Sequence, residues 1–155
     1  MNESGNIWFK TAKEHLQHAR NALNIDDFYI AYTEAITSGE CSLKSILARY
    51  NRLTPDDLHH KFQILLSKII AENIIPHQLS DNIGLIIGNP CSSGLGRIDL
   101  NSPSGNHQDC FSRQLPSLRY PKDDSSPDEF MKEADAIQKI KDAEALINLI
   151  SPLFG

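Results

Sequence analysis

The segment Arg119-Tyr120-Pro121-Lys122 brings two cationic side chains close to an aromatic ring. Guanidinium groups pair with phosphate oxygens and aromatic rings stack on bases, so this group has the parts needed to hold a nucleotide. The structural alternative is that Tyr120 packs as an anchor for the helix that follows, while Arg119 pairs with an acidic side chain. We favour packing for Tyr120 and a ligand-binding role for Arg119.

The six histidines raise the question of a metal site. Zinc sites bring three or four ligands together, usually with a recognisable spacing in the sequence. His59 and His60 are adjacent, His15 and His18 stand three residues apart, and the other two are scattered. No set of residues has zinc-site spacing. The sequence therefore predicts a solvated pair at His15 and His18, with no metal and no cofactor.

Length, charge and cysteine content limit the class of protein. The 155 residues fit one domain with one core, spanning residues 1–155. A net charge of −5 argues against unassisted binding to long nucleic acid but leaves room for a small basic pocket. The first ten residues do not form a signal peptide, and no apolar run is long enough for a membrane span. Three widely spaced cysteines indicate reduced thiols in a cytoplasmic protein.

Hydrophobic periodicity predicts a series of helices. In the first segment apolar residues recur at helical spacing, at Trp8, Ala12, Leu16, Ala19 and Leu23. The same pattern predicts helices over residues 7–23 and 28–50, a third from Thr54 to before Pro76, a short one over about 79–87, and a last one from Ser126 to Pro152. Residues 89–125 are rich in Gly, Pro, Ser, Asn and Asp without periodicity, which predicts a long irregular loop.

Several residues specify how these helices begin and pack. Thr54 can act as an N-cap with Pro55 at the first helical position, and Ser126 with Glu129 forms a capping box. Gly39 inside the second helix can permit close helix packing. Amphipathic helices bury their apolar stripes only against one another. The expected fold is therefore all-α: an antiparallel up-and-down bundle of four to five helices, with the long loop before the last helix.

Three stretches of the chain carry a family resemblance. In the second predicted helix, Ala31-Tyr32-Thr33-Glu34-Ala35 leads into Glu40-Cys41-Ser42-Leu43-Lys44-Ser45-Ile46-Leu47. The third predicted helix contains His59-His60-Lys61-Phe62 followed by Leu65-Leu66. The third stretch, Leu118-Arg119-Tyr120-Pro121, precedes the last helix. In this order the stretches resemble the alanine-rich second helix, the histidine-then-leucine third helix and the Arg-Tyr-Pro of the HEPN family (higher eukaryotes and prokaryotes nucleotide-binding).

The resemblance implies two candidate sites. Many HEPN proteins are metal-independent ribonucleases, in which an arginine holds the phosphate and a histidine a few residues later transfers a proton. That motif stands near the last long helix, where this chain has Arg113 and Arg119 but no histidine, and this argues against catalysis. Arg52 and His59 have the family's arginine-to-histidine spacing, but they lie across the turn into the third helix. The alternative is that Arg52 caps the end of the second helix and His59 lies in the first turn of the third. Lys44 either lines a phosphate-binding groove or forms a surface pair with Glu40.

The resemblance also implies three alternative functions. The favoured one is a non-catalytic module that forms a homodimer and binds a nucleotide or RNA near Lys44, His59, Arg119, Tyr120 and Lys122, with a small nucleotidyltransferase as partner. The second is a ribonuclease of toxin or defence type that uses Arg52 and His59. The third is a scaffold that has no small ligand and recruits a partner protein through an exposed helix stripe and the long loop.

Overall fold

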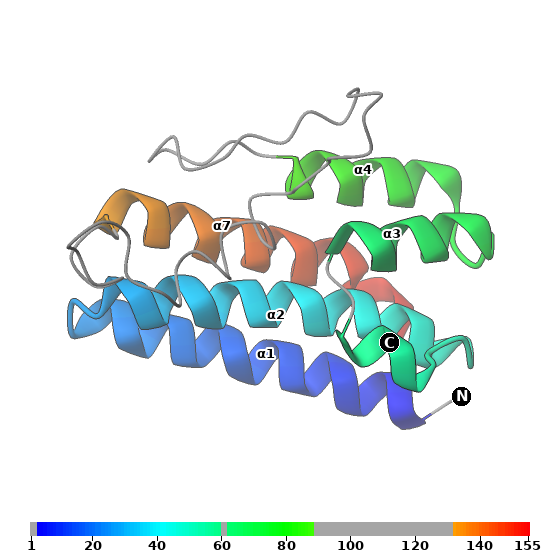
Figure 1. Cartoon of the computed structure of the whole chain (residues 1–155), viewed down its shortest axis with the longest axis horizontal. Coiled ribbons are helices and arrows are strands. Elements are labelled where there is room, and N and C mark those ends of the chain that lie inside the picture. Colours follow the sequence, from blue (N-terminus) through cyan, green and yellow to red (C-terminus); the bar gives the residue numbers. More distant parts are fainter. Residues whose placement is uncertain (1–2, 60–61, 89–131) are drawn as a thin grey trace.

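The computed structural model describes residues 3–59, 62–88 and 132–155. Within these ranges all regular structure is helical (Figure 1): α1 (Glu3–Asn24), α2 (Phe28–Arg49), the 3-10 helix η1 (Pro55–His59), α3 (Phe62–Ala71), α4 (His77–Ile87), α7 (Glu133–Ile150) and the 3-10 helix η2 (Ser151–Phe154). The predicted all-α bundle is confirmed. None of the described helices combines the length and apolar character needed to cross a membrane. The loop predicted over 89–125 lies outside the described residues.

Helices α1 and α2 form an antiparallel hairpin joined by a short turn. The backbone N–H groups of Asp26 and Asp27 donate to the carbonyls of Leu23 and Ala22 at 3.0 and 2.9 Å, which closes the end of α1. Asp26 has a φ of 59°, a left-handed conformation that Asp and Asn adopt more readily than other side chains. The Asp27 carboxylate then accepts from the Ile30 N–H at 3.1 Å and caps α2.

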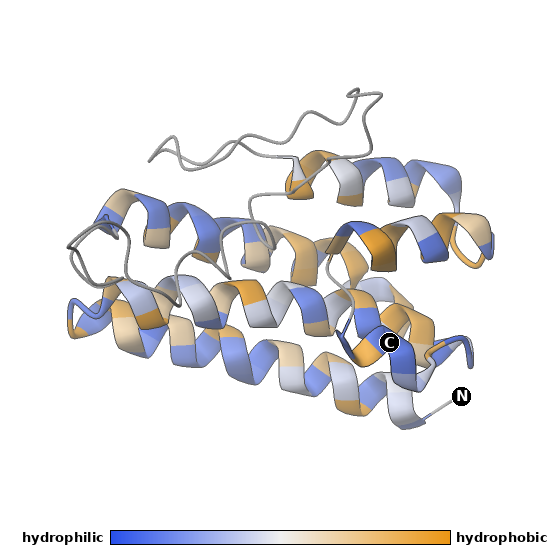
Figure 2. Cartoon of the chain, in the orientation of Figure 1, coloured by the Kyte–Doolittle hydropathy of each residue, from blue (hydrophilic) through white to orange (hydrophobic). Residues whose placement is uncertain are grey.

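The remaining helices are layered around α2. In Figure 1, α1 lies on one side of α2, α3 and α7 lie on the other, and α4 covers α3. The end of the chain returns to α1, where the rings of Phe9 and Phe154 stack with centroids 4.4 Å apart. Each helix carries both hydrophilic and hydrophobic residues, as Figure 2 shows, so each buries one face in the shared core.

The predicted apolar stripes are correct in position but shifted at their edges. In α1, Ala12, Leu16 and Ala19 are buried as expected, but the stripe continues through Phe9 and Ala22, whereas Trp8 and Leu23 are only partly buried. Trp8 and Phe9 are neighbours at one edge of the apolar face, and Ala22 and Leu23 at the other. Helical spacing alone does not identify which residue of each pair points into the core. In α3 the buried residues are Phe62, Leu65 and Ile69.

Two predicted helix starts differ from the structure. Thr54 does not accept a hydrogen bond as an N-cap. Instead, its hydroxyl donates to the Asp57 carboxylate at 2.9 Å, because that buried carboxylate is the stronger acceptor. The helix that follows is the 3-10 helix η1, and α3 begins only at Phe62. The last helix, α7, begins at Glu133 after an extended Lys132, and the Ser126–Glu129 capping box lies outside the described residues.

Gly39 lies in the middle of α2 at the point where α3 begins. A Cβ built on Gly39 would stand 2.2 Å from Cζ of Phe62, far inside van der Waals contact. The Phe62 ring is fully buried, so it has no free space to move into. The close helix packing predicted from this glycine is confirmed, and its partner is the first residue of α3.

Replacing Gly39 with alanine is expected to lower the free energy of unfolding by about 1–3 kcal/mol, the usual cost of overpacking a filled core. The matched control is Gly84→Ala on α4, where the new methyl would meet only Leu66 Cδ2, at 3.9 Å. That variant should be neutral or more stable by up to about 1 kcal/mol, because alanine favours helix. Urea unfolding followed by circular dichroism measures both. Wild-type stability of Gly39→Ala would contradict this packing.

Candidate functional site

Lys44 points into the fold and holds η1 against α2. Lys44 is only 7% exposed, and its Nζ donates to the Leu58 carbonyl oxygen at 3.0 Å. The same ammonium lies 5.6 Å from the centroid of the Trp8 ring on α1, within range of a cation–π contact. Lys44 therefore joins three elements, α1, α2 and η1, through contacts that neither reading of the sequence foresees.

Arg52 and His59 stand at the two ends of the segment that contains η1. The Arg52 backbone N–H donates to the Leu47 carbonyl at 2.8 Å beside Asn51, whose φ is 57°, so Arg52 helps to close the end of α2. Its exposed guanidinium Nε lies 3.3 Å from Oε2 of Glu72, just after α3. His59 is exposed at the last position of η1. The guanidinium of this pair thus already has a carboxylate partner.

Asp57, a residue of η1, connects this segment to Thr54 and to Lys68 of α3. Its carboxylate is 1% exposed and accepts from the Thr54 N–H at 2.7 Å, from the Thr54 hydroxyl and from Nζ of Lys68 at 2.5 Å. Burial acts to raise the pKa of this carboxyl, but the hydrogen bonds to Lys68 and Thr54 outweigh it and lower the pKa to about 2. In the sequence Asp57 simply follows Thr54 and Pro55 at a predicted helix start, and nothing in the pattern indicates this role.

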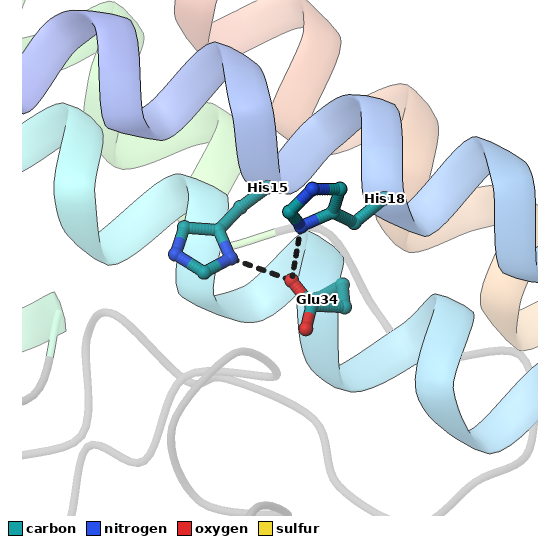
Figure 3. Close-up of side chains that lie close together, drawn as sticks. All are labelled: His15, His18 and Glu34. Atoms are coloured by element: carbon teal, nitrogen blue, oxygen red, sulfur yellow. Dashed lines mark hydrogen bonds and ion pairs between the residues drawn. The ribbon is translucent and has the colours of Figure 1, made fainter.

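Three potential metal ligands meet on the α1–α2 hairpin, as Figure 3 shows. Nδ1 of His15 lies 2.5 Å from Oε2 of Glu34, and Nδ1 of His18 lies 3.8 Å from the same oxygen. His15 and Glu34 have side chains 28% exposed, and that of His18 is 61% exposed. The sequence shows the histidine spacing but predicts only a solvated pair. It misses Glu34, because a third ligand on another helix becomes visible only when the two helices are in register.

Cys41 is the one cysteine within the described residues, and it is a free thiol buried in α2. Burial raises the pKa of this thiol to about 11, so it stays protonated and unreactive near neutral pH. This agrees with the prediction of a reduced cysteine at this position. Cys91 and Cys110 lie outside the described residues, as do Arg119, Tyr120 and Lys122.

Comparison with known proteins decides the family. The model of the HEPN domain matches residues 6–153, nearly the whole chain. The chain belongs to the HEPN domain family. Neither the curated proteins nor the solved structures give a match. The predicted resemblance is therefore confirmed, and it supports a nucleotide- or RNA-related module at the level of the family.

In this HEPN domain, the described candidate residues lie around η1. Lys44 contacts the segment from α2, Asp57 is buried within it, and Arg52 and His59 mark its two ends. The two buried residues position η1, while Arg52 and His59 are both exposed. The arrangement can present an imidazole to a ligand from a fixed backbone.

Replacing Asp57 with asparagine is expected to lower the free energy of unfolding by about 2 kcal/mol at neutral pH, the equivalent of its pKa shift. Because the folded pKa of about 2 is below the ordinary aspartate pKa of 3.8, the ionised carboxylate stabilises the fold above pH 3.8. This contribution is lost as the pH falls through the folded pKa. The difference between wild type and Asp57→Asn should therefore shrink from about pH 4 to about pH 2.

Urea unfolding at several pH values between these limits measures the effect. The control is Asp56→Asn, which alters the neighbouring, exposed carboxylate and should change stability little. A difference between Asp57→Asn and wild type that does not depend on pH would contradict a stabilising ionised Asp57.

Proposed function

We infer that this HEPN domain binds a nucleotide or a short RNA segment, acts with a partner protein and does not cleave its ligand. The family match over nearly the whole chain supports the nucleotide- or RNA-related role. The observation that carries the non-catalytic part is the Arg52–Glu72 ion pair, because a guanidinium already held by a carboxylate is less available to a phosphate. The net charge of −5 favours a short ligand over long nucleic acid.

The proposed ligand-binding residues are Lys44, His59, Arg119, Tyr120 and Lys122. Lys44 acts indirectly, since its ammonium holds the carbonyl of Leu58, the residue directly before His59. His59 is exposed and can contact the ligand. Arg119 and Lys122 supply cations for phosphate groups, and Tyr120 offers a ring on which a base can stack.

Binding of a fluorescein-labelled, mixed-sequence single-stranded RNA, followed by fluorescence anisotropy, tests this proposal. The Arg119→Ala variant should bind roughly tenfold or more weakly, because a hydrogen bond to a charged group contributes about 1.5–3 kcal/mol. The matched control is Arg20→Ala, which removes a partly exposed guanidinium paired with Glu144 at 3.2 Å. That control should bind as wild type does. Equal losses in the two variants would indicate only a general effect of charge and would contradict a site at Arg119.

Incubation of the same RNA without metal separates the alternatives. Wild-type protein is expected to leave the RNA intact. Cleavage that is lost in both Arg52→Ala and His59→Ala would overturn the non-catalytic proposal and assign a ribonuclease of toxin or defence type. A protein that neither cleaves nor binds RNA or nucleotide would be the scaffold instead.

The proposed partners are a second copy of the chain and a small nucleotidyltransferase. HEPN domains often dimerise, which supports the homodimer. Helices α3 and α4, here called the outer pair, offer apolar surface for the homodimer. Ile64 on α3 is 50% exposed and Leu85 on α4 is 66% exposed. Exposed side chains of this size on two packed helices are suited to contact another apolar surface.

Sedimentation velocity tests the homodimer. Wild-type protein should sediment at twice the chain mass of 17.3 kDa. Leu85→Lys should shift it toward the monomer, because a lysine at an apolar contact must be desolvated. Ile25→Lys is the control, since Ile25 is 77% exposed in the turn between α1 and α2, away from the outer pair. A monomeric wild type contradicts the homodimer, and a Leu85→Lys dimer contradicts this face.

A further inference from the structure

We propose that His15, His18 and Glu34 form a binding site for a divalent transition metal, with Zn²⁺ as the best fit, which links α1 to α2. The site uses none of the residues assigned to nucleotide or RNA binding. It stands on the convergence of three donor side chains from two helices, drawn in Figure 3.

The histidines are placed on the same face of α1. Residues three positions apart on a helix are neighbours on its surface, so both imidazoles can reach one point. Their ring centroids are 5.8 Å apart and the rings are nearly perpendicular, which keeps them from stacking against each other. Glu34 enters from α2, and the turn between the helices fixes its register against α1.

The donor atoms lie at distances that suit one small ion. All three ligand atoms are within 4.8 Å of one another. Zinc binds nitrogen and oxygen at about 2.0–2.2 Å, so two donors on a tetrahedral ion stand about 3.3 Å apart. The distances of 2.5 Å and 3.8 Å from the Glu34 oxygen to the two imidazoles fall on either side of that value. Side-chain shifts below about 1 Å therefore suffice to seat the ion.

His18 lies at ion-pair distance, not hydrogen-bond distance, from Glu34. The Glu34 oxygen is already engaged by His15 at 2.5 Å, while His18 is 3.8 Å away, beyond hydrogen-bond range. The His18 side chain is 61% exposed, yet its Nδ1 faces that same oxygen rather than solvent. A shared cation satisfies both nitrogens and the carboxylate at once.

The donor set selects the class of metal. Two imidazole nitrogens and one carboxylate oxygen suit Zn²⁺ and similar transition metals, whereas Mg²⁺ and Ca²⁺ prefer oxygen ligands throughout. Three protein ligands leave a fourth coordination position, which at this partly exposed site falls to water or to an anion. Because the ligands come from both helices, the metal would stabilise the hairpin as well.

Titration of the full chain, without a histidine tag, with ZnCl₂ by isothermal calorimetry tests the proposal. Wild type should bind one ion per chain and show a higher Tm in the presence of Zn²⁺. His18→Ala should bind at least roughly tenfold more weakly, since even outer-shell substitutions at metal sites cost that much. The high exposure of His18 makes this variant safe for the fold. The matched control is His77→Ala, an exposed histidine at the start of α4, which should bind as wild type does.

Glu34→Gln provides the second variant. Glutamine keeps an acceptor for His15 but removes the charge, so the fold should persist while Zn²⁺ affinity falls. The same variants with Co²⁺ should lose the visible absorption of a protein-bound ion. The proposal is overturned if wild type binds no Zn²⁺. It is also overturned if His18→Ala and Glu34→Gln bind as tightly as His77→Ala, because binding would then occur at other histidines.

Discussion

The close packing around the middle of α2 is the constraint on which the rest of the bundle depends. The Ser38 hydroxyl donates to the Ala12 carbonyl of α1 at 2.7 Å, so the backbone of α1 lies directly against α2. Gly39, the next residue, meets the Phe62 ring of α3. Two adjacent small residues thus admit a helix on each of two sides, and α7 packs on α2 as well. A larger side chain at either position would separate α2 from a neighbour and move every element that α2 positions.

Buried charges then determine where η1 lies between α2 and α3. Lys44 is held by the Leu58 carbonyl, and Asp57 by Lys68 and Thr54, so each charge removed from water has hydrogen-bond partners. A shift of η1 would leave these groups buried and unpaired, which costs far more than the pairs contribute when intact. The charges therefore specify one position for η1, and this also fixes the backbone of the exposed His59 at its end. The buried pair of Lys139 and Asp142 lies within α7, so it satisfies two buried charges without linking α7 to another helix.

The sequence predicts where the main helices lie, although not every helix start or stripe edge. It locates α1, α2, α3 and α4 from their apolar periodicity. It also predicts close packing at Gly39, because a glycine inside a helix destabilises the helix unless its small size allows a neighbour to approach. It does not predict contacts that depend on how two helices are aligned. The burial of Lys44 beneath η1 and the approach of Glu34 to His15 both depend on that alignment. For the same reason, Phe9 rather than Trp8 fills the core: the choice depends on the rotation of α1 against α2.

The proposed metal ligands and Lys44 lie on different parts of the α1–α2 hairpin. Glu34 and Lys44 are ten positions apart on α2, which corresponds to about 15 Å along the helix. On α1, His15 lies seven positions from Trp8, about two turns away, and the Trp8 ring lies beside the Lys44 ammonium. A metal held by His15, His18 and Glu34 would therefore not reach the Lys44 ammonium. It can still hold the register of α1 against α2, and that register places Trp8 against Lys44. Any effect of the metal on ligand binding would have to travel through the hairpin itself.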